Sequence, residues 1–207
     1  MRTERVGFAL CGSFCTHEKA LTALKRLTEE YETVIPIVSE NAAFTDTRFG
    51  TSDALLEQLE ELTGHEVLYD IPSVEPLGPK GMIDVLVIAP CTGNTLSKLA
   101  HGIADDMLTT TVLAAKCPKL VSPAMNTGML ENPITQDNLR TLEHYGFTVI
   151  PSESGVLACK DVGSGRLPKE DVLLDYIFRA IAKTKDLAGL RIAVTAGPTQ
   201  EPLDPVR

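Results

Sequence analysis

Short apolar runs alternate with amphipathic stretches along the first half of the chain. The runs at 6–11, 34–38 and 84–90 are rich in β-branched residues, and the last, DVLVIAP, is nearly all apolar. A parallel strand that is covered on both faces has this composition. Between these runs, leucine and alanine recur with helical spacing at 17–30 and 51–63. The pattern therefore predicts strands and helices in alternation.

The same alternation continues in the second half of the chain. Asn132 and Pro133 open a helix, because Asn is a favoured N-cap and Pro a favoured first helical residue. Together these elements predict an α/β fold with a doubly wound parallel sheet, Rossmann-like or flavodoxin-like, in a single domain over residues 1–183. The further elements are helices at about 94–103, 106–116 and 169–183, and strands at 119–124 and 147–151.

Two segments fall outside this pattern. Residues 152–168 are glycine-rich and lack periodicity, so we expect a mobile loop. Residues 184–207 are predicted to be a linker and the opening strand of a further domain that is not completed within the chain.

Composition excludes several classes of function. With 43% hydrophobic and 23% charged residues and a net charge of −9, the chain has globular values and no basic stretch. We therefore expect no nucleic-acid or membrane partner. The start of the chain has no signal-peptide pattern, which predicts a cytoplasmic protein. The five cysteines are odd in number and scattered, so we expect buried free thiols and no metal site.

Candidate binding residues follow three predicted strands. In a doubly wound fold a ligand lies beyond the carboxyl ends of the strands. Hydroxyl groups, a glycine turn and a helix N-terminus at that edge suit a phosphate group. Plain helix capping explains each turn equally well when it is taken alone. The candidates are Gly12, Ser13, Ser39, Thr92, Asn94 and Thr95.

Three longer segments carry a resemblance. APCTGNTLSKLAHGIADDMLTTTVLA (89–114), SPAMNTGMLENPITQDNL (122–139) and GVLACKDVGSGRLP (155–168) resemble the phosphopantothenoylcysteine decarboxylase family of flavoproteins. The resemblance implies FMN as the cofactor, held at the turns just named. The terminal VTAGPTQEPLDPVR resembles the opening of the phosphopantothenate–cysteine ligase domain that often follows this decarboxylase.

The resemblance also implies a substrate site. Asn126 would hold the substrate carboxylate, and Cys159, in a flap, would close over the substrate and return a proton. The Pro-Ala-Met-Asn segment faces substrate in the family, so Met125 is a candidate contact, although a packing role suits it too. Arg166 in the flap is a candidate for a substrate phosphate or carboxylate.

The first half of the chain departs from that family. The family's catalytic histidine lies eight residues before the aspartate that opens the central strand, and counting back from Asp84 gives Pro76. Glu75 and His101 are the replacements to consider. GSFCTHEK, TDTRFG and EPLGPK resemble the flavoprotein-like subunit of dipicolinate synthase.

Three functions therefore stay open. They are a decarboxylase-like lyase that acts on a cysteine conjugate with altered or weak activity, a dipicolinate-synthase-like subunit with a dicarboxylate substrate and a partner subunit, and a flavin-binding protein without its own turnover. The resemblance further implies a homo-oligomer, either a trimer or a dodecamer.

Overall fold

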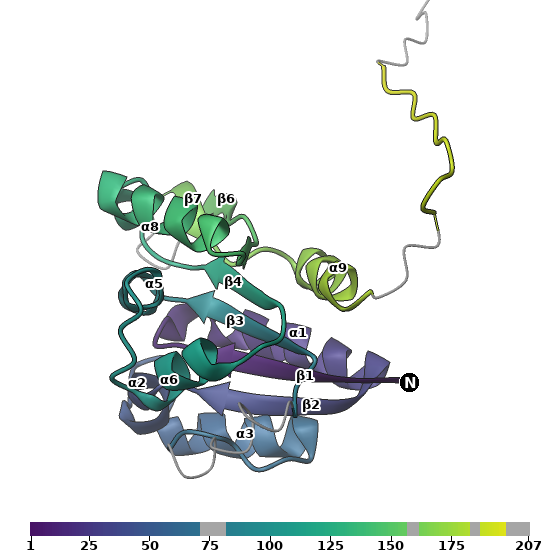
Figure 1. Cartoon of the computed structure of the whole chain (residues 1–207). Helices are drawn as coiled ribbons and strands as arrows, with labels where there is room; N and C mark the ends of the chain where they lie inside the picture. The colour runs from purple at the N-terminus through teal and green to yellow at the C-terminus, as the bar shows by residue number, and fades with distance from the viewer. Residues whose placement is uncertain (71–81, 157–161, 183–186, 198–207) are drawn as a thin grey trace, which may run out of the picture.

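A five-stranded parallel sheet forms the centre of the protein (Figure 1). The computed structural model describes residues 1–70, 82–156, 162–182 and 187–197. The strands follow the order β2-β1-β3-β4-β5, so the chain moves outward from β1 in both directions. This order confirms the predicted doubly wound α/β fold. The strands are β1 (Arg2–Leu10), β2 (Tyr31–Val38), β3 (Val85–Cys91), β4 (Lys119–Pro123) and β5 (Thr148–Val149).

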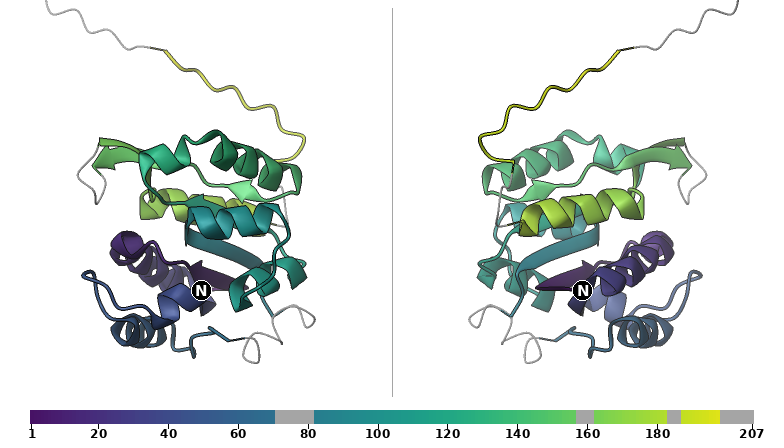
Figure 2. Two further views of the ribbon diagram at one scale, coloured as in Figure 1. Left: turned by 90° about the vertical axis from the view of Figure 1, so that its left-hand side faces the viewer. Right: turned by 90° about the vertical axis from the view of Figure 1, so that its right-hand side faces the viewer.

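Helices cover both faces of the sheet (Figures 1 and 2). One face packs against α1 (His17–Glu30), α3 (Ser52–Thr63) and α9 (Glu170–Ile181). The other face packs against α5 (Gly93–Ala100), α6 (Met107–Ala114) and α8 (Pro133–His144). Three short helices, η1 (Phe14–Thr16), α2 (Glu40–Phe44) and α7 (Thr127–Leu130), lie between these elements.

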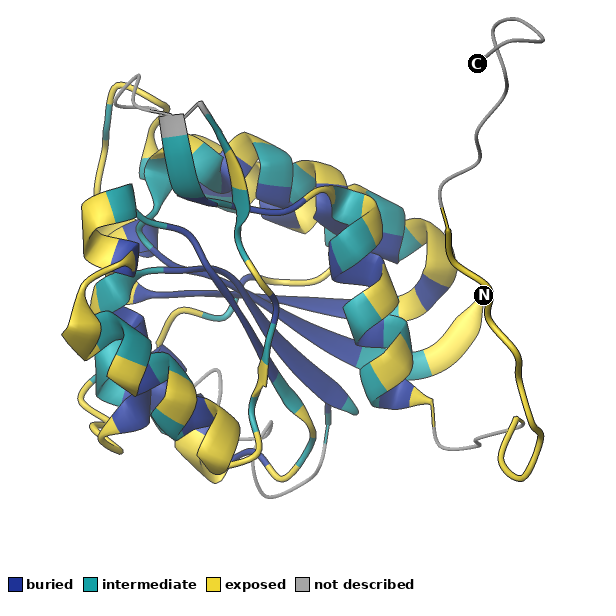
Figure 3. Ribbon diagram, turned by 90° about the horizontal axis from the view of Figure 1, so that it is seen from above, coloured by how far each residue is buried: buried dark blue, intermediate teal, exposed yellow. Residues whose placement is uncertain are grey.

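Alternation along the strands divides the core into two clusters. In β1, Val6, Phe8 and Leu10 belong to the cluster under α1 and α9, whereas Ala9 belongs to the cluster under α5 and α6. Every residue of β3 is buried, as the all-apolar run predicts for the middle of a parallel sheet. Figure 3 shows this buried sheet between partly exposed helices. The apolar pattern therefore fixes both the strand positions and the side that each helix covers.

The expectation of a structureless loop at 152–168 is wrong for its two arms. β6 (Glu153–Val156) and β7 (Val162–Arg166) pair as an antiparallel hairpin. Its sequence lacks a hydrophobic alternation because the hairpin packs with its backbone, through glycines, against residues 125–127. Residues 157–161, which join the arms and include Cys159, lie outside the described residues.

Two findings concern the remaining parts of the chain. Within the described ranges, no helix combines the length and apolar character needed to cross a membrane. Residues 187–197 form no helix or strand beyond a turn at their start, and Leu190, Ile192 and Val194 are exposed. The predicted division between residues 1–183 and 184–207 stays a prediction.

Candidate functional site

The three predicted binding turns meet at one edge of the sheet. β1, β2 and β3 are parallel neighbours, so their carboxyl ends lie side by side. A cavity of about 510 Å³ opens there, which we call the cofactor cavity. Five of the six predicted cofactor residues line it, and Ser13 does not. The lining residues are Gly12, Phe14, Ser39, Glu40, Asn41, Thr45, Thr92, Gly93, Asn94, Thr95, Lys98, Asp106 and Met129.

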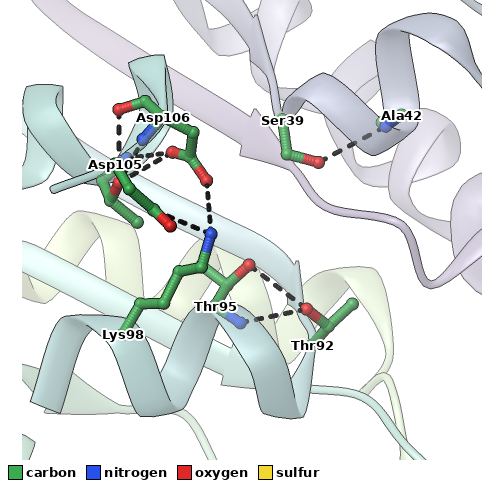
Figure 4. Close-up of polar contacts among 8 residues, drawn as sticks. Ser39, Ala42, Thr92, Thr95, Lys98, Asp105 and Asp106 are labelled. Carbon is green, nitrogen blue, oxygen red and sulfur yellow. Dashed lines mark hydrogen bonds and ion pairs between the residues drawn. The ribbon is translucent and has the colours of Figure 1, made fainter. Parts of the chain in front are cut away.

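Hydroxyl groups cap the helices that begin at this edge. The Ser39 Oγ accepts a hydrogen bond from the Ala42 N–H at 3.4 Å, at the start of α2. The Thr92 Oγ1 accepts from the Thr95 N–H at 3.3 Å and lies 3.2 Å from the Thr95 Oγ1, at the start of α5. Figure 4 shows these hydroxyls on separate elements of the site. Capping is thus real here, and it also fixes the hydroxyls in the cavity wall.

Two glycines keep the cavity open. A Cβ atom at Gly12 would lie 3.4 Å from both the Asn41 Cβ and the Phe14 ring. A Cβ atom at Gly93 would lie 3.3 Å from the Met129 Cε and 3.6 Å from the Met125 Sδ. The backbone at both turns is therefore bare toward the cavity, which suits a ligand that approaches it closely.

Beneath the cavity lie two buried thiols. Cys11 and Cys91 end neighbouring strands and are fully buried. A hydrogen bond with Cys11, together with burial, raises the pKa of Cys91, so this thiol stays protonated. The His17 Nε2 lies 2.8 Å from the Cys11 carbonyl oxygen, and burial lowers the pKa of His17 despite this bond. These groups support the Gly12 turn from below, in agreement with the prediction of buried free cysteines.

The segment around Asn126 adjoins the cofactor cavity. Asn126 caps α7, with its Oδ1 accepting from the Gly128 N–H at 2.8 Å. Met125 and Met129 on either side of it approach Gly93, which belongs to the α5 turn. The structure therefore places the expected substrate segment directly against the expected cofactor turn.

The β6–β7 hairpin docks on the same segment. The Met125 N–H donates to the Gly165 carbonyl at 3.0 Å, and the Thr127 Oγ1 donates to the Ser164 carbonyl at 2.8 Å. Gly165 has φ +117°, and a Cβ atom there would lie 2.1 Å from the Met125 carbonyl oxygen. Only glycine fits this contact, so the hairpin is built to lie beside Asn126.

Other predicted residues are less directly placed. Arg166 is half-buried and crosses its own hairpin, since a Cβ atom at Gly155 would lie 3.0 Å from the Arg166 Nη1. His101 is exposed at the end of α5, with its Nδ1 2.8 Å from the Ser97 carbonyl, which is a helix-surface position. Cys159, Pro76 and Glu75 lie outside the described residues.

Sequence reasoning missed two charged residues of the cavity wall. Lys98 comes one helical turn after Thr95, and Asp106 is the N-cap of α6. The Asp106–Thr109 capping box was readable as a helix start, because each side chain bonds the other's backbone N–H. Its approach to Lys98 depends on the fold and carries no sequence signal.

The cavity fits a phosphorylated ligand with a flat ring. Its volume lies within the range of small-molecule sites. Fixed hydroxyls and bare glycine turns lie beside the start of α5, where an anion is favoured. Phe14 and Met129 supply apolar wall. Among the described residues, no group of His, Cys, Asp and Glu is placed to hold a metal ion.

Comparisons with known proteins agree with this site. The flavoprotein family profile matches residues 1–182. The bifunctional coenzyme A biosynthesis protein CoaBC of Mycobacterium bovis is 40% identical over 194 residues, covering 91% of this chain and 45% of that protein. The chain thus spans about half the length of the curated relatives it matches.

Three solved structures are similar throughout their length. A cysteine-to-serine mutant of PPC decarboxylase, complexed with pantothenoylaminoethenethiol, has a TM-score of 0.72 at 29% identity and covers 85% of this chain and 97% of its own. The FMN-dependent cysteine decarboxylase SpaF has a TM-score of 0.68 at 29% identity, covering 86% and 95%. A dipicolinate synthase subunit from Bacillus halodurans has 0.67 at 27% identity, covering 87% and 92%. Both predicted resemblances are confirmed.

Proposed function

The chain belongs to the flavoprotein family, and from that premise we propose that it binds FMN in the cofactor cavity. The observation that carries the proposal is the convergence of three strand ends on one cavity with fixed hydroxyls at Ser39, Thr92 and Thr95. The phosphate would lie among these hydroxyls at the start of α5, where N–H groups favour an anion. The similar protein SpaF is FMN-dependent.

We further propose a decarboxylase-like reaction on a cysteine conjugate, which makes the chain a carbon–carbon lyase. Bound FMN would supply two-electron oxidation of the cysteine carbon–sulfur unit, which permits loss of carbon dioxide. Asn126 would hold the substrate carboxylate beside the cavity. The β6–β7 hairpin would exclude water from that side, and Cys159 would return a proton at the end of the reaction.

Weak activity is part of this proposal. Pro76 stands where the decarboxylase family has its catalytic histidine, and proline has no proton to exchange. Loss of a general base costs about 10²–10⁴ in rate when nothing replaces it. Asn126 keeps the substrate carboxylate in place without that base, so binding would survive better than turnover. Coenzyme A biosynthesis is the setting that the CoaBC relatives suggest.

A second candidate is a dipicolinate-synthase-like subunit, since the Bacillus halodurans protein is similar at 27% identity over 87% of the chain. The favouring observation is EPLGPK, which occupies the place of the histidine segment. Such a protein would take a dicarboxylate and require a partner subunit. For either candidate we propose a cytoplasmic homo-oligomer, a trimer or a dodecamer, although the family can also hold flavin without turnover.

Carbon dioxide release from phosphopantothenoylcysteine by the FMN-loaded chain tests the reaction. We expect slow release, a gain in rate with Pro76→His, and loss of release with Asn126→Ala while FMN stays bound. A wild-type rate of about 1 s⁻¹ or more, as in ordinary enzymes, would show that another residue is the base. Release that Asn126→Ala leaves unchanged would contradict the substrate site.

A further inference from the structure

The cofactor cavity has an unfavourable charge for an anionic ligand. Among its described lining residues, Glu40 and Asp106 are carboxylates, and Lys98 carries the one positive charge. The whole chain has a net charge of −9, so the surroundings do not reverse this balance. A phosphate ester that carries about two negative charges near neutral pH needs compensation here. The arrangement of Lys98 therefore decides how the cavity receives it.

Lys98 is held between two carboxylates (Figure 4). Its Nζ lies 2.8 Å from the Asp105 Oδ1 and 3.3 Å from the Asp106 Oδ2. The Asp105 side chain is 55% exposed, whereas those of Lys98 and Asp106 are only 20% and 15% exposed. Water can therefore screen Asp105 but not the other two charges to the same degree. Of the two ion pairs, the one with Asp106 is the one that acts on the cavity.

Asp106 cannot turn away from the cavity to avoid a phosphate. Its Oδ1 accepts from the Thr109 N–H and from the Thr109 Oγ1, both at 2.8 Å. These bonds cap α6, so moving the carboxylate would open the first turn of that helix. The carboxylates, Asp105 foremost, also raise the pKa of Lys98, which keeps its ammonium charged. A fixed negative charge in the wall is thus neutralised by a fixed positive one.

We propose that Lys98 is the residue that makes this cavity select a phosphorylated flavin over its unphosphorylated form, by neutralising Asp106. The inference rests on the proposed function. Oxidised riboflavin carries no net charge, so it is insensitive to Asp106, whereas FMN is repelled by an uncompensated Asp106. A purely structural role for Lys98, which ties α5 to the start of α6, would change the affinity for both flavins alike.

Binding of FMN and of riboflavin to wild-type and Lys98→Met protein tests the inference. We expect the ratio of the two dissociation constants to shift against FMN by at least about tenfold at low salt, the size of a Coulomb change across roughly 10 Å near a protein surface. Added salt should restore FMN affinity in the variant and leave riboflavin affinity unchanged. Lys98→Arg keeps the charge and should keep the wild-type ratio.

Circular dichroism establishes that the variants fold, and Lys98→Gln replaces Lys98→Met if the latter does not. Wild-type protein that binds FMN, with an unchanged ratio in the charge-removing variant, would overturn the inference alone. Wild-type protein that binds neither flavin would overturn the proposed function and the inference together.

Discussion

Docking of the β6–β7 hairpin depends on the absence of a side chain at Gly165. In Gly165→Ala the new Cβ would lie 2.1 Å from the Met125 carbonyl oxygen, a distance that real contacts do not reach. The backbone at φ +117° costs a residue other than glycine about 1–3 kcal/mol. Separation of the strands also removes the Met125–Gly165 hydrogen bond, worth about 0.5–1.5 kcal/mol. The docked state should therefore lose roughly 2–4 kcal/mol.

The expected result is local undocking, because β7 and residues 125–127 lie beside the core sheet and not within it. Hydrogen exchange measured by mass spectrometry or NMR would report the Met125 amide. At 1.4 kcal/mol for each factor of ten, its exchange should accelerate by about 30-fold or more. FMN binding should change little, while carbon dioxide release should fall.

Gly146→Ala is the matched control. Gly146 has φ +85°, and a Cβ atom there would meet no heavy atom within 4 Å. This variant adds about 1–2 kcal/mol of left-handed strain without a clash, so Met125 exchange should be unchanged. Wild-type protection of the Met125 amide in Gly165→Ala would refute the account of how the hairpin is held.

Three further predictions concern the edge of the sheet. Thr92→Val removes the α5 cap and should lower stability by about 1 kcal/mol and weaken FMN binding, as melting and titration would show. Because burial lowers the pKa of His17 from its ordinary 6.5, protonation favours the unfolded chain: stability should decline as pH falls below about 6.5, and His17→Gln should reduce that decline in denaturant titrations at several pH values. Brief alkylation with mass spectrometry should label the exposed Cys15 ahead of the fully buried Cys11 and Cys91; the reverse order would contradict their placement beneath the cavity.

Local sequence signals predicted the sheet and three of its binding turns. The buried strand β3 was readable because both of its faces are covered, which requires an uninterrupted apolar run. Ser39 and Thr92 were readable because parallel strands end at the same edge, so residues after different strands come together. Both inferences need only the alternation of elements.

Features that depend on backbone packing were not readable. The β6–β7 hairpin is held by glycines against residues 125–127, and glycine content alone indicates a loop. Lys98 and Asp106 approach each other only because α5 and α6 pack together, and either residue alone suits a solvated helix end. The charge balance of the cavity therefore had to come from the structure.

Equilibrium titration of FMN with the wild-type protein, followed by flavin fluorescence and by melting, tests the central claim most directly. The account predicts saturable binding of one FMN per chain. At a concentration 100 times the dissociation constant, FMN should stabilise the fold by about 2.7 kcal/mol. Flavin fluorescence that the protein leaves unchanged, with no rise in melting temperature, would contradict the assignment of the cavity to this cofactor.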